Sequence, residues 1–299
     1  MTHEEAFLQD ILERPDDDAR LIFADWLEDN GDPDRAEFIR VQMADRAPHG
    51  ARGHRYPARA DELLLRNWDR WVAPLARLVN PDGADPYLPW LREGPNLSVA
   101  KALPNYPRGF VSELTMAADR LVANGEAILR LAALTRLRLH GAGGLGAKLA
   151  GCPALRWVRE IGFIDYFRAP VGAEDMAALA ASPHLGRLTA LRLHRNNLGN
   201  DGARALAGAA WLTGIEYLDL TDNGLSTAGL SALVDRRDLR NLRVLRLDHN
   251  GLDAWAVSLL LDSPWLDQLE FLSLRNAGIS PHQADEIAAR APRLRVSIG

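Results

Sequence analysis

The feature that most constrains this chain is a pattern that recurs every 27 residues. Three segments carry the pattern L-x-x-L-x-L-x-x-N-x-L, with an isoleucine in the first place of the second segment. They begin at Leu188, Ile215 and Leu242. A fourth segment begins at Leu269 and has Ala277 where the others have asparagine. Because a fixed period of this length marks repeating structural units, we predict that these segments stack on one another.

Weaker copies precede these four segments. One begins at Leu134 and has Ala142 in the asparagine place. The lead-in Cys152-Pro153-x-Leu155 matches the later lead-ins at 182–185 and 263–266, which predicts a strand over 158–163 and a longer turn at 165–168. A capping strand is expected near Val111, Leu114 and Met116. The sequence therefore predicts seven strands, of which the first three are irregular.

Each repeat has an alternating half and a helical half. In L-x-L the leucines fall on one face of a short strand and the intervening residues on the other. The asparagine side chain can bond backbone groups of the turn that follows the strand. The second half is short and rich in alanine and leucine, as in residues 202–207. No single repeat buries its own apolar face, so stability has to come from neighbouring repeats.

The 27-residue unit resembles the ribonuclease-inhibitor-like subclass of leucine-rich repeats over roughly Val111 to Gly299. This resemblance implies an α/β solenoid with a curved parallel sheet and helices on its convex side. It implies little about function, because such repeats serve many binding tasks.

A small all-α domain is expected ahead of the repeats. Thr2 and Glu5 form a capping-box pattern, Asp16-Asp17-Asp18 opens a second helix, and Gly31-Asp32-Pro33 ends that helix and begins a third. A fourth helix is expected to place Leu64, Trp68, Trp71, Val72 and Leu75 on one face. Residues 5–8, 16–28, 31–32 and 37–42 resemble the bacterial "repeat-companion" domain, which commonly precedes leucine-rich repeats. We expect domains at 1–46, 47–108 and 109–299, with the first covering the apolar end of the solenoid.

Composition excludes several classes of protein. The formal charge of -5 lacks the basic field typical of nucleic-acid binders. The single cysteine, Cys152, excludes an internal disulfide framework. The first residues are acidic and no apolar segment is long enough to cross a bilayer. We therefore expect a cytoplasmic monomer that binds no nucleic acid, membrane or cofactor.

Three motifs suggest chemistry that their context does not support. Gly141 to Gly146 matches G-x-G-x-x-G, but too few residues follow it for a crossover helix, and Lys148 is one place late for a phosphate-binding loop. The acidic run 29–34 would put Trp26 at the first ligand position of a calcium loop. The eight histidines form no metal-ligand motif, and no nucleophile, base and orienting group emerge together. We therefore expect no catalytic, cofactor or metal site.

The candidate binding residues are those that flank the strand leucines on the expected concave face. They are Arg136, Arg138, His140, Arg192, His194, Arg195, Tyr217, Asp219, Asp222, Arg246, Asp248, Phe271 and Arg275. The arginines and histidines of the earlier repeats are expected to form a basic patch, followed by aspartates between the two aromatic residues. Arginine and aromatic residues are enriched in the centres of protein interfaces. The alternative is a solvated face on which Arg192 and Arg246 only balance Asp219.

The sequence thus favours a module or scaffold that holds a protein partner on the concave face. A regulator or inhibitor of an enzyme, such as a GTPase or a nuclease, is the alternative by analogy of fold. An enzyme is the least favoured class.

Overall fold

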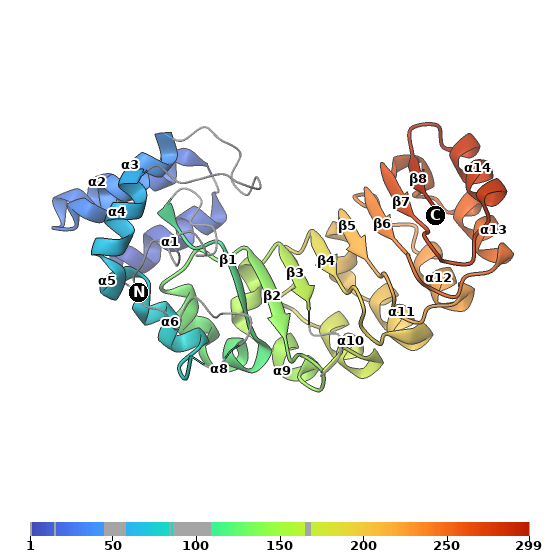
Figure 1. The fold of residues 1–299 in the computed structure, drawn as a ribbon, viewed down its shortest axis with the longest axis horizontal. Helices are drawn as coiled ribbons and strands as arrows, with labels where there is room; N and C mark the ends of the chain where they lie inside the picture. Colours follow the sequence, from blue (N-terminus) through green and yellow to red (C-terminus); the bar gives the residue numbers. More distant parts are fainter. Residues whose placement is uncertain are drawn as a thin grey trace. The chain divides into compact units, whose positions relative to one another are not determined.

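A computed structural model of the chain describes residues 2–14, 16–44, 58–83, 85, 109–164 and 169–298. The expected loop at 47–57, most of the proline-rich stretch 81–107 and the turn at 165–168 lie outside these residues. The chain comprises two compact units, an N-terminal unit of residues 1–137 and a C-terminal unit of residues 138–299 (Figure 1). The expected domain boundaries remain predictions.

The N-terminal unit begins with helices. They are α1 (His3–Glu13), α2 (Asp17–Asp29), α3 (Pro33–Ala44), α4 (Ala58–Arg66), α5 (Trp68–Trp71) and α6 (Ala73–Val79), followed by β1 (Glu113–Ala117) and α8 (Ala118–Leu129). The predicted starts are confirmed: Thr2 and Glu5 form a reciprocal capping box, and Asp16 accepts a hydrogen bond from the Ala19 amide at 3.2 Å. Gly31 ends α2 with a φ of +89°, a left-handed conformation that suits glycine.

The single fourth helix predicted over residues 64–75 is wrong, because the structure divides this region into α4, α5 and α6. Asn67 and Val72 lie at the two breaks. Pro74 explains the second break: a proline inside a continuous helix removes a hydrogen-bond donor and clashes with the preceding turn. It is tolerated at the second position of a new helix, where it lies in α6.

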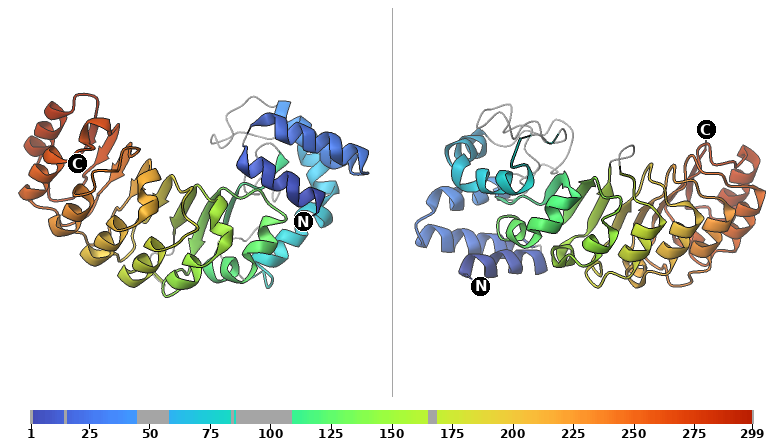
Figure 2. Two further views of the ribbon diagram at one scale, coloured as in Figure 1. Left: turned by 180° about the vertical axis from the view of Figure 1, so that it is seen from behind. Right: turned by 90° about the horizontal axis from the view of Figure 1, so that it is seen from below.

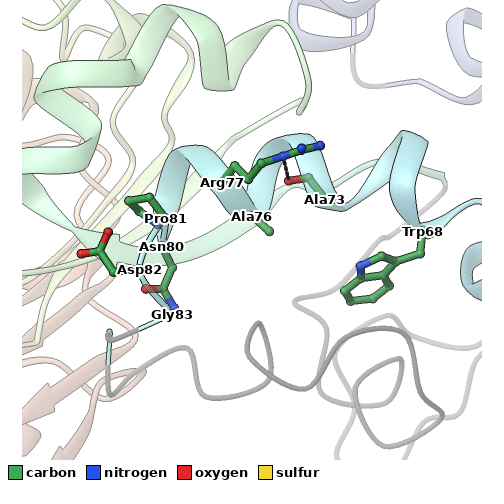
Figure 3. Close-up of a pocket in the computed structure, with 8 residues that line it drawn as sticks. All are labelled: Trp68, Ala73, Ala76, Arg77, Asn80, Pro81, Asp82 and Gly83. Atoms are coloured by element: carbon green, nitrogen blue, oxygen red, sulfur yellow. Dashed lines mark hydrogen bonds between the residues drawn. The ribbon is translucent and has the colours of Figure 1, made fainter.

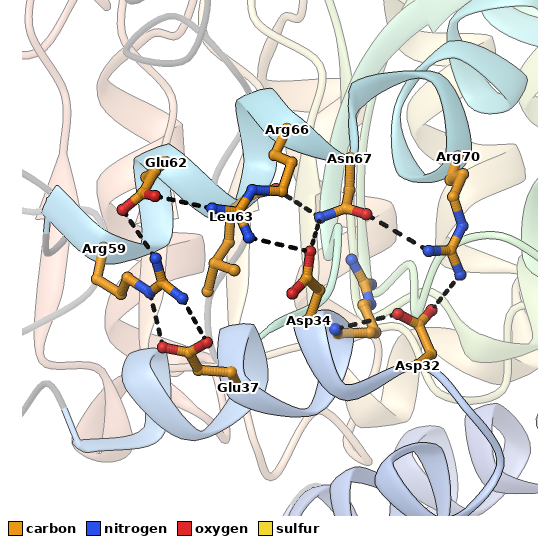
Figure 4. Close-up of polar contacts among 10 residues, drawn as sticks. Asp32, Asp34, Glu37, Arg59, Glu62, Leu63, Arg66, Asn67 and Arg70 are labelled. Carbon is orange, nitrogen blue, oxygen red and sulfur yellow. Dashed lines mark hydrogen bonds and ion pairs between the residues drawn. The ribbon is translucent and has the colours of Figure 1, made fainter.

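Polar contacts join α3 to α4 and α5 (Figure 4). The Arg59 guanidinium donates two hydrogen bonds of 2.7 Å to the Glu37 carboxylate, and Asn67 donates one of 2.8 Å to Asp34. The bond from Arg59 lowers the pKa of Glu37, and the bond from Asn67 lowers the pKa of Asp34. Both carboxylates are therefore held in the ionised form that the network requires.

In the same unit, Gly109 and Phe110, which lie shortly before β1, contact the N-terminal helices. The Gly109 amide donates to Gln42 Oε1 at 2.6 Å, and Arg35 donates to the Gly109 carbonyl at 2.8 Å. The rings of Phe23 and Phe110 stack with centroids 5.9 Å apart. Residues directly ahead of β1 are therefore anchored on α2 and α3.

The C-terminal unit consists of repeating strand and helix pairs. Its strands are β2 (Arg136–His140, which begins in the N-terminal unit), β3 (Glu160–Phe163), β4 (Ala190–Arg192), β5 (Tyr217–Asp219), β6 (Val244–Arg246), β7 (Phe271–Ser273) and β8 (Arg295–Ser297). Its helices are α9 (Gly146–Ala150), α10 (Ala173–Ala180), α11 (Gly199–Ala207), α12 (Thr227–Val234), α13 (Ala254–Asp262) and α14 (Pro281–Arg290). Within this unit the strands form one sheet, and the helices cover one side of that sheet (Figures 1 and 2).

The predicted α/β architecture is confirmed. The strands lie in sequence order, and each neighbouring pair from β3 to β8 is parallel. Leu191 aligns with Leu218 and Leu245, and all three are buried. The predicted number of seven strands is wrong, because the described residues form eight. β8 pairs Val296 with Leu272 after a shortened connection.

The asparagines connect successive repeats. Asn223 is 1% exposed and donates hydrogen bonds to the carbonyl oxygens of Leu193 (2.7 Å) and Thr221 (3.0 Å). Asn250 donates to Leu220 of the preceding repeat and accepts hydrogen bonds from the amides of Asn223 and Leu225. The predicted bonding of asparagine to turn backbone is confirmed, and it also reaches the repeat before.

Candidate functional site

Side chains that alternate with the strand leucines form rows across the sheet on the side opposite the helices. We call this surface of residues 138–299 the concave face. The backbone register aligns Ala190, Tyr217, Val244 and Phe271 in one row. It aligns Gly162, Arg192, Asp219, Arg246 and Ser273 in the next. The predicted residues of these strands are thus brought together across the sheet, although most are far apart in sequence.

Two arginines flank a position without a side chain. A Cβ atom placed on Gly162 would lie 3.6 Å from the Cβ of Arg192 and 4.0 Å from the Cγ of Arg138. Arg192 also donates a 2.6 Å hydrogen bond to Glu160, and its guanidinium carbon lies 4.1 Å from the centre of the Tyr217 ring. The result is a compact lateral stack over β2 to β5.

Two of the predicted aspartates, Asp219 and Asp248, are buried and therefore do not form an acidic patch on the surface. Asp219 is 5% exposed and Asp248 is 2% exposed. Asp219 accepts a hydrogen bond from the Thr221 amide at 3.0 Å, and Asp248 accepts bonds from Ser273 Oγ at 2.5 Å and the Arg275 amide at 2.8 Å. Arg246 lies 3.9 Å from Asp219 and 3.2 Å from Asp248. These carboxylates therefore stabilise the strand ends and hold Arg246 in place.

His194 contributes less positive charge than its residue type suggests. Burial lowers its pKa below the ordinary value of 6.5, an effect that the nearby Asp219 carboxylate opposes. The imidazole is therefore mainly neutral at pH 7. The positive charge of the predicted basic patch therefore comes from its arginines.

The third residue after each of strands β4 to β7 has an unusual backbone conformation. Arg195, Asp222, His249 and Asn276 have φ angles of 55°, 54°, 55° and 49°. This left-handed conformation costs a non-glycine residue about 1–2 kcal/mol. Arg195 lies 3.4 Å from Asp222, and both are exposed. Because the same turn recurs in each repeat, the strain belongs to the repeat and does not mark a site.

The remaining candidates lie outside this stack. Arg295 places its guanidinium carbon 5.8 Å from the centre of the half-buried Phe271 ring, and exposed Arg275 donates to Ser297 Oγ at 2.9 Å. His140, at the end of β2, is half-buried. Arg136 belongs to the N-terminal unit, where it lies 3.8 Å from Glu113.

A hollow of about 450 Å³ adjoins the concave face at the start of strands β5 and β6, and sequence reasoning missed it. Its lining comprises Glu216, Tyr217, Asn241, Arg243, Val244 and Glu270. Glu216, Arg243 and Glu270 each directly precede a strand, one repeat apart. The sequence could have identified these charged residues, because they recur every 27 residues, as regularly as the strand leucines.

The glycine-rich segment resembling a dinucleotide motif has a packing role. The amides of Gly144 and Gly146 donate to the Asp175 carboxylate at 3.1 and 2.9 Å. A Cβ on Gly146 would lie 2.4 Å from the Asp175 Cα, so only glycine allows this approach. A carboxylate of the next repeat thus takes the amide groups that a phosphate would require.

A second hollow, of about 470 Å³, belongs to the N-terminal unit (Figure 3). It is lined by Trp68, by residues 73, 76 and 77 of α6, and by residues 80–83 of the following turn. Arg77 donates to the Ala73 carbonyl at 3.2 Å, and Asp82 lies 3.7 Å from Arg120. These charged groups are therefore already engaged within the unit.

Two further features are absent from the residues that the structure describes. No three histidine, cysteine or acidic side chains gather there as a metal site would require. No described helix is both long and apolar enough to span a bilayer.

Comparison with known proteins identifies the repeats. Residues 188–207 and 214–234 match a family model described as a leucine-rich repeat, so the chain carries leucine-rich repeats. No curated protein matches the sequence. One similar solved structure is an internalin from Listeria monocytogenes, with 15% identity and a TM-score of 0.41. The match covers 67% of this chain and 50% of the internalin chain, so this chain spans about half of that protein's length.

Proposed function

We propose that this leucine-rich-repeat chain is a protein–protein interaction module that holds its partner on the concave face. We also propose that the repeats belong to the ribonuclease-inhibitor-like subclass, that residues 1–46 form a repeat-companion domain, and that the protein is a cytoplasmic monomer. We propose neither a catalytic activity nor a cofactor.

The stack of Glu160, Arg192 and Tyr217 is the observation that carries the proposal. The Arg192 guanidinium is fixed between the Glu160 carboxylate and the tyrosine ring at 2.6 and 4.1 Å. An arginine held in this way loses little side-chain entropy when it binds. Tyr217 supplies rigid contact area, and arginine and tyrosine are both common among the residues that dominate binding energy.

The distribution of charge supports a protein partner with local acidic groups. Arg138 is exposed beside Gly162 and adds a second cation next to the stack. The carboxylates of Asp219 and Asp248 are paired with Arg246, so their negative charge is partly balanced within the face itself. Complementary charge on a partner would mainly raise the association rate and the specificity.

The test is affinity capture with a variant that changes the stack and leaves the leucine core intact. We choose Arg138→Glu with Arg192→Gln, because a glutamate at 192 would face Glu160. The matched control is Arg237→Glu with Arg240→Gln, which makes the same change in charge at exposed positions outside the strands.

We expect the wild type and the control to capture the same partner and the concave-face variant to lose it. Circular dichroism should be the same for all three. If the concave-face variant retains the partner, this face is not the binding site.

A further inference from the structure

The hollow at the start of β5 and β6 combines an aromatic wall with charged groups. Tyr217 and Val244, which are aligned neighbours in the sheet, supply its half-buried apolar surface. Glu216 and Glu270 are exposed on its lining, and 74% of the Glu270 side chain is accessible to solvent. It therefore offers apolar contact and negative charge within about 450 Å³.

The Tyr217 ring has a different neighbour on each side. Arg192 of β4 stacks on it at 4.1 Å, while Val244 of β6 lies on the other side in the sheet register. The hollow lies on this second side, since it includes Tyr217 and Val244 but no residue of β4. Arg246 of β6 also interacts with the Tyr217 side chain but does not line the hollow, so the Tyr217 surface that lines the hollow can still accept a cation from outside.

The two aromatic residues of this row, Tyr217 and Phe271, each lie against an arginine of the same chain. Arg192 stacks on Tyr217, and Arg295, the aligned neighbour of Phe271, lies 5.8 Å from the centre of that ring. In both cases an arginine from an adjacent strand covers the aromatic residue. The side of Tyr217 toward β6 has Val244 in the aligned position.

The negative charge of the hollow is only partly balanced. Arg243 is the one cation of its lining, and its Nε lies 4.0 Å from Glu270 Oε1. Its Nη1 donates to the Gln268 carbonyl at 3.4 Å. Glu216 makes no ion pair or side-chain hydrogen bond with any residue that the structure describes. One carboxylate is thus available to a cation from outside.

We propose that this hollow receives an arginine side chain of the protein partner. The proposal rests on the proposed function, because it assigns one subsite of the same face. The methylene groups of the arginine pack on Tyr217 and Val244. Its planar guanidinium stacks on the tyrosine ring and donates to the Glu216 carboxylate. Lysine fits less well, because its compact ammonium does not stack in this way.

The test uses N-acetyl-arginine N-methylamide as the probe and the full chain as the receptor. Binding is followed by amide chemical shifts in heteronuclear NMR. The citrulline and lysine analogues are titrated in parallel, because citrulline keeps the shape of arginine and lacks its charge. We expect the arginine probe to saturate shifts at residues 216, 217 and 244, and to bind at least about fivefold more tightly than the citrulline probe.

Variants separate this hollow from a general attraction for cations. Glu216→Gln should weaken binding of the arginine probe about two- to fivefold, as expected for one exposed charge interaction. Tyr217→Leu should weaken it further through loss of the ring. The control Glu174→Gln removes an exposed carboxylate on α10 and should leave the affinity unchanged.

Equal affinities for arginine and citrulline, a preference for lysine, or shifts outside the hollow would each overturn the proposal, as would no saturable shift at all. The proposed function can fail separately. If the arginine probe does not bind but Arg138→Glu with Arg192→Gln still abolishes partner capture, only the arginine subsite is wrong. If the probe binds but that variant retains the partner, the hollow remains and the function is wrong.

Discussion

Replacing Asn250 by alanine should destabilise the C-terminal unit more than the same change at Asn223. Asn250 Oδ1 accepts hydrogen bonds from the amides of Asn223 (3.2 Å) and Leu225 (3.0 Å). Its amide group donates to the carbonyl oxygens of Leu220, Leu247 and Asp248. Asn223 donates to two carbonyl oxygens, but its own Oδ1 has no partner among the described residues.

The magnitude follows from the groups left without a partner. Asn250→Ala orphans two buried amides and removes a donor from three carbonyl oxygens. Each unsatisfied buried group costs about 1–3 kcal/mol, so the loss should reach about 3–5 kcal/mol after partial relaxation. Asn223→Ala orphans no amide and should cost about 1–2 kcal/mol, since a carbonyl oxygen is less costly to leave unpaired.

Urea unfolding followed by far-ultraviolet circular dichroism measures the difference between the two variants. Amide hydrogen exchange supplies a local reading, because the Leu225 amide should lose protection in Asn250→Ala and keep it in Asn223→Ala. Equal losses of stability, or an unchanged exchange rate at Leu225, would refute the assignment of these hydrogen bonds.

Three further predictions concern other parts of the chain. Gly278→Ala should unfold the last repeat, because its Cβ would lie 2.1 Å from the Leu252 carbonyl oxygen, whereas Gly224→Ala has open space there and should cost only about 1–2 kcal/mol, as urea unfolding can show. Burial lowers the pKa of folded His194, so the unfolded chain binds its proton first and stability should fall as the pH drops below 6.5. His194→Gln should reduce that slope in unfolding measured from pH 7.5 to 5. A fragment of residues 109–299 exposes Phe110 and should aggregate in light scattering; a folded monomer would show that the N-terminal helices are not a cap.

The alternation of leucines was enough to predict the sheet, because any other register would expose them. Leu191, Leu218 and Leu245 align as the repeat spacing requires. β8 was missed because its connection is shorter than the 27-residue period, so its Val296 falls outside the pattern. Its lead-in, Pro292-x-Leu294, repeats an earlier signal and could have revealed it.

The missing asparagine at Ala277 has a physical explanation that sequence alone does not supply. The Leu252 amide donates directly to the Ala277 carbonyl oxygen at 2.9 Å, so backbone replaces the side chain. The close approach of Gly278 to Leu252 belongs to the same arrangement. Ala277 is therefore a different form of the contact, which implies that alanine at Asn250 would not be equally tolerated.

The candidate site was predicted less completely than the fold. Strand alternation assigned Arg192, Tyr217 and Arg246 to one face. The register places Arg192 and Arg246 on either side of Asp219 in one row and Tyr217 in the adjacent row. Alternation does not say how deeply a side chain is enclosed. Asp219 and Asp248 are buried because backbone amides and Arg246 bind their carboxylates, and these contacts depend on turns that the repeat pattern leaves undefined.

Site-specific photocrosslinking tests the central claim most directly. A photoreactive amino acid replaces either Val244, on the concave face, or Trp255, which is 65% exposed on the helix α13. Each chain is irradiated in lysate of its native host, and the crosslinked products are identified by mass spectrometry. The account predicts one dominant protein joined through position 244 and not through position 255. A partner that crosslinks only through position 255 would contradict it.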